Sequence, residues 1–190
     1  MAMELGDGVT LKGWLLYDAS DVACLRGMYT SYLLEEYDRI SELAFGNPVA
    51  GYLVTSFIRR NDENVGFVSL DHEQRAVELI YVKPEHRGNG LAALVLGELN
   101  RICPQTLALK TPLSPGGEAL AEALGLERAH NFPHEEAKNQ ETLRIIREGI
   151  KRTCRHQGKG RSGGDPRKMC RRCYQAALHK YADAVIAKFT

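Results

Sequence analysis

The chain lacks long apolar runs and has few aromatic residues. Phe, Trp and Tyr make up 7% of its 190 residues, and there is a single tryptophan. The longest apolar run, residues 91–96, is far shorter than the roughly 20 residues that a membrane-spanning helix needs. Residues 1–7 contain neither a basic segment nor an apolar one, which is unlike a secretory signal. We therefore expect a cytoplasmic protein without a membrane partner.

The whole chain has almost no net charge, but its N-terminal and C-terminal parts carry opposite net charges. Residues 1–150 contain 14 basic and 22 acidic residues, a net charge of −8. Residues 151–190 contain 11 basic and 2 acidic residues, a net charge of +9. This asymmetry indicates a tail with an acidic partner, although a solvated basic tail would have the same composition.

The first half of the chain has the hydrophobic pattern of strands and one long helix. Residues 9–16 predict a strand, and Ser20 or Asp21 is placed to cap a helix that ends near Leu43. Three further strands are expected, separated by polar turns, at residues 50–58, 65–70 and 76–82.

After residue 82, helices and strands alternate. A loop leads into a helix at 91–102, and a strand follows at 106–110. Ser114 opens another helix, Gly125 ends it, and a last strand begins at 126–129. Hairpin strands followed by strand–helix–strand–helix predict an α/β fold with a mixed sheet. Two C-terminal helices are expected, at 135–152 and 172–189.

The loop between the strand at 76–82 and the helix at 91–102 contains two glycines, Gly88 and Gly90. Glycines let the backbone approach a ligand closely, and the first N–H groups of a helix have no acceptor within it. Together with the helix dipole, these groups form a site for an anion such as a pyrophosphate. The loop lacks the third glycine of a dinucleotide-binding fingerprint and the Gly-Lys-Ser/Thr of a Walker loop.

Residues 87–92, Arg-Gly-Asn-Gly-Leu-Ala, resemble the coenzyme A motif of the GNAT superfamily, Arg/Gln-x-x-Gly-x-Gly/Ala. The similarity extends over about residues 9–132 and includes the Leu-Gly at the end of the helix that Ser114 opens. It implies a GNAT-like fold and an N-acyltransferase that uses acetyl-CoA or another acyl-CoA. The alternative is a glycine loop that only turns the chain between a strand and a helix.

The resemblance also implies roles for individual residues. The loop amides would hold the pyrophosphate, the strand before the loop would pair with the pantetheine, and an N–H near Val82 would face the oxyanion. Glu78 is the candidate base, with a surface carboxylate as the alternative. Many relatives use a late-helix tyrosine as the acid, but residues 118–125 contain none, and the nearest hydroxyl, Ser114, is either the acid or only a helix cap. The expected coenzyme-binding residues are Ile80, Tyr81, Val82, Arg87, Gly88, Asn89, Gly90, Leu91, Ala92 and Ala93.

The C-terminal segment contains four closely spaced metal-ligand candidates. Cys154 and His156 are followed, after a gap of thirteen residues, by Cys170 and Cys173. Four such ligands suit a tetrahedral, structural zinc ion, and their arrangement resembles treble-clef zinc modules. The alternatives are unrelated free thiols, or His179 in place of His156.

Basic residues surround these cysteines and suit contacts with the phosphates of DNA or RNA. An acidic protein partner, the ribosome, or a role in packing or dimerisation is the alternative. The residues are Lys151, Arg152, Arg155, Lys159, Arg161, Arg167, Lys168, Arg171 and Arg172.

The sequence thus predicts a GNAT-like domain at 1–134, followed by a helix and a basic, zinc-binding Cys/His module at 135–190. The function we expect is transfer of an acyl group from acyl-CoA to an amine on a nucleic-acid or nucleoprotein substrate. A DNA base is one candidate acceptor, by analogy with Mom-type GNAT relatives. The alternative is a non-catalytic, nucleic-acid-binding zinc protein with a degenerate acyl-CoA-binding domain.

Overall fold

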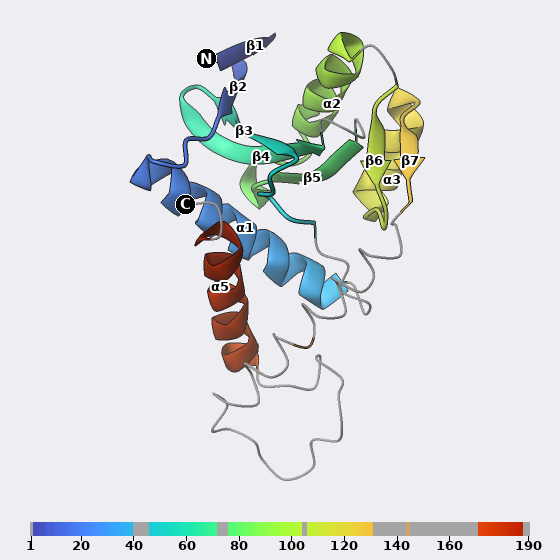
Figure 1. Cartoon of the computed structure of the whole chain (residues 1–190). Coiled ribbons are helices and arrows are strands. Elements are labelled where there is room, and N and C mark those ends of the chain that lie inside the picture. Colours follow the sequence, from blue (N-terminus) through green and yellow to red (C-terminus); the bar gives the residue numbers. More distant parts are fainter. Residues whose placement is uncertain are drawn as a thin grey trace.

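A computed structural model describes residues 2–39, 46–71, 76–103, 106–130, 144 and 171–187. Within this part of the chain, seven strands form one sheet in the order β1-β2-β3-β4-β5-β6-β7 (Figure 1). Neighbours from β1 to β5 run antiparallel, whereas β6 and β7 are added in parallel to β5. The predicted α/β fold with a mixed sheet is therefore confirmed.

The elements have the following bounds. The strands are β1 Ala2–Gly6, β2 Val9–Gly13, β3 Leu53–Arg60, β4 Glu63–Asp71, β5 Ala76–Val82, β6 Ala108–Lys110 and β7 Glu127–Ala129. The helices are α1 Ala19–Arg39, α2 Leu91–Ile102, α3 Pro115–Leu124 and α5 Arg171–Ala187, with a short 3-10 turn at Pro84–His86.

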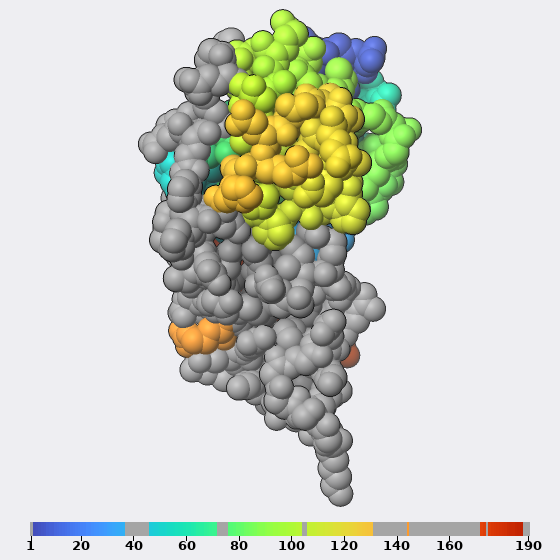
Figure 2. All heavy atoms as spheres, turned by 90° about the vertical axis from the view of Figure 1, so that its right-hand side faces the viewer, coloured from blue at the N-terminus to red at the C-terminus, as the bar shows by residue number. Residues whose placement is uncertain are grey.

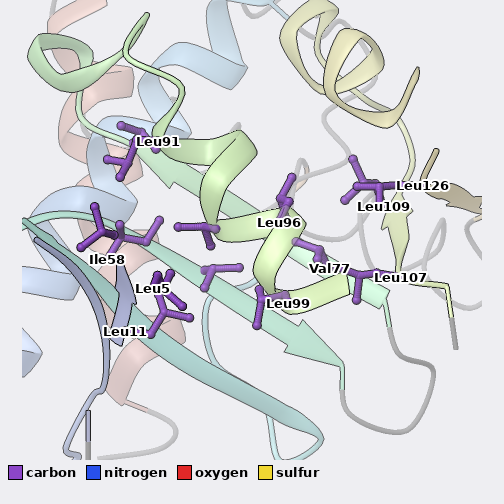
Figure 3. Packing of buried hydrophobic residues seen from close by; sticks show 14 of the residues in the cluster. Leu5, Leu11, Ile58, Val77, Leu91, Leu96, Leu99, Leu107, Leu109 and Leu126 are labelled. Atoms are coloured by element: carbon purple, nitrogen blue, oxygen red, sulfur yellow. The ribbon is translucent and has the colours of Figure 1, made fainter. Parts of the chain in front are cut away.

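Helices cover both faces of the sheet. On one face, α1 and α5 pack against each other and against aromatic residues of β3 and β4, including Phe57 and Phe67. On the other face, α2 directs Leu96 and Leu99 at the sheet, close to Val77 (Figure 3). Because both of its faces are covered, β5 is almost continuously apolar. In the view of Figure 2, α3 and β7 face the viewer and form the outer surface of the molecule on the side of β6.

The N-terminal strand is a hairpin rather than the single strand expected at 9–16. β1 and β2 are joined by a tight turn in which Asp7 has a φ of 51° and Gly8 a φ of 69°. Asp-Gly is a strong signal for such a turn, because these residues adopt positive φ most readily. The Asp7-Gly8 turn is therefore the local feature that pairs β1 with β2.

Helix α1 begins at Ala19, two or three residues earlier than a cap at Ser20 or Asp21 predicts, and has a different cap. A carboxylate oxygen of Asp18 accepts hydrogen bonds from the backbone N–H groups of Ser20 (2.8 Å) and Asp21 (3.2 Å). The carboxylate of Asp21 is instead buried, and it accepts bonds from Leu15 N and from Lys12 Nζ. Neither residue that we proposed as the cap therefore has that role. The expected end of the helix, near Leu43, lies outside the described residues.

The elements around the glycine loop have the bounds that the sequence predicts. β5 and α2 agree residue for residue, and α3 is capped by Ser114 and ends at Gly125, which is left-handed with a φ of 61°. The strand expected at 106–110 is shorter and begins at Ala108.

The C-terminal part of the chain is described only in part. The helix expected at 172–189 is present as α5, and its apolar stripe, including Leu178 and Ile186, packs on α1. Of the helix expected at 135–152, only Arg144 is described, and it is helical. The predicted domain boundary at residue 134 lies outside the described residues. None of the helices described here has both the length and the apolarity to cross a membrane.

Candidate active site

The sheet divides between β5 and β6. Among the described residues, these strands pair only where Ala76 faces Ala108 and Val77 faces Leu109. The remainder of β5, from Glu78 to Val82, has a free edge on the side of β6 (Figure 1). The gap is a cavity of about 620 Å³, lined by the free edge of β5, the C-terminal half of α1, the start of α2, the end of β6 and the start of α3.

Glu78 occupies an irregular position in β5. In the pairing with β4, Leu79 faces Ser69 and Val77 faces Leu70, so Glu78 is an extra residue without a partner. Such a β-bulge interrupts the alternation of side chains. Accordingly, Val77 packs beneath α2, whereas Leu79 packs on the opposite face beneath α1. The bulge directly follows the last residue of β5 that pairs with β6.

The carboxylate of Glu78 is buried and bonded on both oxygens. One oxygen accepts the backbone N–H of Asn47 at 3.1 Å, and the other forms a short ion pair with Lys110 Nζ. The exposed fractions of the two charged side chains are only 4% for Glu78 and 12% for Lys110. Both residues line the cavity, so Glu78 lies in the cleft and not on the outer surface of the sheet.

The glycine loop has the geometry of an anion site. Gly88 and Gly90 have φ angles of 79° and 71°, a region that favours glycine. The first bond of α2 runs from Leu94 N to Gly90 O, so the N–H groups of Leu91, Ala92 and Ala93 have no acceptor within the helix. No acidic side chain lies in this first turn. The dipole of α2 and these amides together favour a bound anion.

The side chain of Arg87 holds the loop in place. Its Nε donates to the carbonyl oxygen of Val82 at 2.7 Å, and its Nη2 lies 2.9 Å from a carboxylate oxygen of Glu35 in α1. The guanidinium is also 5.3 Å from the centre of the Tyr81 ring. Burial, followed by the charge of Glu35, raises the pKa of the Tyr81 hydroxyl. Arg87 thus connects the loop to both β5 and α1.

The model of the family described as "Acetyltransferase (GNAT) family" matches residues 19–126. The chain belongs to the GNAT acetyltransferase family. No curated protein and no solved structure gave a significant match. The matched segment runs from the start of α1 to the residue before β7, so it contains the divided sheet, the bulge and the glycine loop.

Most of the coenzyme-binding residues predicted for the GNAT domain lie along the cavity. The backbone of β5 and the first turn of α2 line it, as does Gly88. Asn89 is exposed and is not one of the lining residues. Their contacts with a coenzyme remain a prediction.

Ser114 also lines the cavity, but its hydroxyl is used in the fold. Its Oγ accepts the N–H of Gly117 at 3.0 Å, as an N-cap does. The expectation that Ser114 caps its helix is therefore confirmed. Its second proposed role, as the acid, stays a prediction.

Residues 46–49, which the sequence predicts only as a helix breaker, are mostly buried and pack against the bulge at Glu78. The hydroxyl of Tyr29 donates to Gly46 O at 3.2 Å, and Gly46 N donates to the hydroxyl of Tyr32 at 3.1 Å. A Cβ on Gly46 would lie 2.9 Å from the carbonyl oxygen of Glu78, so only glycine fits there. Asn47 is held next to Glu78 by this packing.

Of the four predicted metal ligands, only Cys173 is described. It lies partly buried in α5, next to the core that α5 shares with α1. Cys154, His156 and Cys170 lie outside the described residues. No group of three or more potential metal ligands was found in the part of the chain that the structure describes. His179, the alternative ligand, is exposed on α5.

The predicted nucleic-acid interface likewise falls mostly outside the described residues. Arg171 and Arg172 lie at the start of α5, and Arg172 is exposed. The other seven residues, Lys151, Arg152, Arg155, Lys159, Arg161, Arg167 and Lys168, are not described.

Proposed function

We propose that this GNAT protein transfers an acyl group from acyl-CoA, acetyl-CoA first, to a primary amine. The observation that carries the proposal is that the free edge of β5 begins at Glu78 and ends at the glycine loop. This arrangement suits a coenzyme with a pyrophosphate at one end and a thioester at the other. The pyrophosphate would accept hydrogen bonds from the backbone N–H groups of Leu91, Ala92 and Ala93. The pantetheine arm, which contains two amides, would lie along the free edge of β5.

The free edge of β5 and the pantetheine arm of the coenzyme have similar lengths. Five residues of free edge, from Glu78 to Val82, span about 16 Å at about 3.3 Å per residue. The extended pantetheine arm has as many backbone bonds as about four residues, which corresponds to roughly 14 Å. A coenzyme held at the glycine loop would therefore extend its thioester beyond Val82, whose N–H we expected at the oxyanion, to the level of Glu78.

The polar groups near that point suit direct attack by an amine. Acyl-CoA supplies an activated carbonyl, so the protein has only to position the amine, take up its proton and return a proton to sulfur. The carboxylate of Glu78 is buried in the cleft, and each of its oxygens keeps a second lone pair. We therefore retain Glu78 as the proposed base.

The acceptor proposed from the sequence is an amine on a nucleic acid or nucleoprotein. Its support is the charge of the basic segment at 151–172 alone, since that charge suits a phosphate backbone. A structural zinc ion held by Cys154, His156, Cys170 and Cys173 is proposed on the chemistry of the donor set. Metal analysis of the purified protein, compared with a Cys154→Ser/Cys170→Ser variant, tests the zinc directly.

The first experiment is calorimetric titration of acetyl-CoA into the full chain and two variants. Gly90→Asp places a carboxylate beside the free amides, where it repels a pyrophosphate. Gly90→Asn has the same shape and the same backbone strain without the charge, and both residues tolerate a positive φ better than most. We expect saturable binding by the native chain, a modest loss with Asn, and at least a tenfold further loss with Asp.

Absence of binding by the native chain would contradict the proposal. Where acetyl-CoA binds, release of the CoA thiol is measured with polyamines, lysine-containing peptides, DNA and RNA as acceptors. Binding without transfer to any of these classes would favour the alternative, an acyl-CoA-binding domain without turnover.

A further inference from the structure

We propose that Lys110 is a catalytic residue of this site, which donates a proton to the departing CoA sulfur and recovers it from Glu78. The inference rests on the acyltransferase function proposed above. It assigns the acid, for which the chain has no tyrosine in the late helix. Three observations support it: the place of the ion pair in the sheet, its burial, and its position at the end of the free edge.

The ion pair lies where the two strands separate. Lys110 directly follows Leu109, and Glu78 directly follows Val77, and these two preceding residues form the last pair between β6 and β5. The ammonium and the carboxylate therefore face each other across the base of the cleft. The thioester of acyl-CoA would reach the same position if the pantetheine arm extended along β5 from the glycine loop.

Stability alone does not account for a charged pair at this position. Removing two charges from water costs several kcal/mol per ion, and apolar residues of similar volume are often as stabilising or more so. The strand pair beside the ions is apolar, with Val77 and Leu109 both buried. Among the described residues, the one other hydrogen bond to the Glu78 carboxylate comes from the backbone N–H of Asn47. Charged groups kept in a cleft despite this cost are typical of reaction centres.

The proposed cycle balances protons and electrons. The amine nitrogen forms a bond to the carbonyl carbon, and the π electron pair moves to oxygen. When this intermediate collapses, an electron pair on oxygen re-forms the carbonyl π bond, the carbon–sulfur bond breaks and its electron pair goes to sulfur. The nitrogen proton passes to the carboxylate of Glu78, and the ammonium of Lys110 protonates sulfur. Transfer of the proton from Glu78 to Lys110, along their existing hydrogen bond, restores the ion pair.

The competing explanation is that the pair only fixes the floor of the cleft. The two explanations differ in what they predict for the sulfur of bound CoA. An ammonium that contacts sulfur stabilises the thiolate and lowers the pKa of the bound thiol, by about one unit or more for a close opposite charge. A pair that is only structural leaves this pKa unchanged.

The test measures ionisation of the CoA thiol by the ultraviolet absorbance of the thiolate, with CoA free and CoA bound to the full chain. We expect the bound thiol to ionise at a lower pH than the free thiol. Lys110→Met should abolish the shift, because it removes the positive charge, and Lys110→Arg should retain part of it. Glu78→Gln should enlarge the shift, because it removes the opposing charge; general damage to the fold would not produce this opposite sign.

Lys110→Met leaves a buried carboxylate without its cation, so this variant is paired with Glu78→Gln/Lys110→Met, which removes both charges. The double variant should bind CoA without any shift in thiol ionisation. Titration of acetyl-CoA into the native chain and every variant distinguishes a failure of the proposed acyltransferase function from a failure of the role proposed for Lys110. If the native chain fails to bind acetyl-CoA, the proposed function fails. If it binds but the thiol titrates as in free CoA, or the shift persists in Lys110→Met, only the role of Lys110 is overturned.

Discussion

Arg87 and Glu35 form an ion pair of 2.9 Å that joins the glycine loop to helix α1. Through the same guanidinium, the loop is bonded to the carbonyl oxygen of Val82 at the end of β5. Three parts of the cleft, the loop, the strand edge and α1, are therefore held by one side chain. The arginine of the coenzyme motif thus positions the loop amides, whatever further contact it makes with a ligand.

We expect Arg87→Lys to weaken acetyl-CoA binding by roughly three- to tenfold, because a lysine cannot bond to Val82 and Glu35 together in the same geometry. The unfolding free energy should change by no more than about 1 kcal/mol, since the exposed fractions of the two side chains are 42% and 40%. Calorimetry and urea unfolding measure the two quantities. Arg101→Lys, at an exposed ion pair within α2, is the control and should leave affinity unchanged. Equal affinity in the Arg87 variant would show that the loop does not depend on this contact.

Ser114 can be tested separately as a cap and as an acid. Ser114→Asn keeps an oxygen that accepts the N–H of Gly117 and adds no charge to the cavity, but it has no hydroxyl, whereas Ser114→Ala loses the cap. We expect the Ala variant to lose about 1 kcal/mol of stability and the Asn variant to remain near the native value. If Lys110 is the acid, acetyl transfer by the Asn variant should stay within a few-fold of native. A transfer rate reduced by orders of magnitude at native stability would restore Ser114 as the acid.

Because Tyr29 is buried, we expect the protein to lose stability at alkaline pH. Its ring is fully buried, and burial raises the pKa of its hydroxyl well above 10.0. The unfolded chain ionises this group near its ordinary pKa while the folded chain holds it neutral, so stability falls as the pH rises above that value. Tyr29→Phe should be about 1 kcal/mol less stable at neutral pH, because it loses the bond to Gly46 O. The difference should shrink as the pH rises beyond 10; a constant difference in urea unfolding would contradict the assignment.

Leu178 tests whether α5 is an integral part of the fold. The side chain is fully buried in the core that α5 shares with α1. Leu178→Ala should therefore cost about 2–5 kcal/mol of unfolding free energy in urea. His179→Ala, at the next and exposed position, should stay within about 0.5 kcal/mol of native. Similar small effects from both variants would mean that α5 contributes little to the stability of the sheet and α1.

Local patterns were sufficient for much of the fold. The bounds of β5 and α2 follow from an apolar run, a glycine loop and a proline, and α3 follows from a capping serine and a C-terminal glycine. Such signals act over a few residues, so they can be read from the sequence directly. The cap of α1 cannot be assigned from the sequence, because Asp18, Ser20 and Asp21 lie close together and are all suitable caps, and only the geometry selects Asp18.

The site was less predictable, because its decisive contacts join distant residues. Lys110 and Glu78 are 32 positions apart and meet only through the pairing of β6 with β5. From the sequence, Lys110 is one lysine at the end of a short apolar strand, which is typical of an exposed residue. The bulge at Glu78 is likewise invisible in β5, where nearly every residue is buried and no alternation can be broken. Gly46 gave a signal that was interpreted only as the end of a helix.

The seam between β5 and β6 is two residue pairs long, and this has a mechanical consequence. So short a ladder cannot by itself fix the angle between the two leaves of the sheet. Helix α2 lies on β5 and also contacts α3, which belongs to the second leaf, so it acts as a brace between them. A small tilt of this brace is converted at the open end into a larger change of width. How far the cleft opens at that end is then governed by the seating of α2 on the sheet, through residues such as Leu96 and Leu99 (Figure 3).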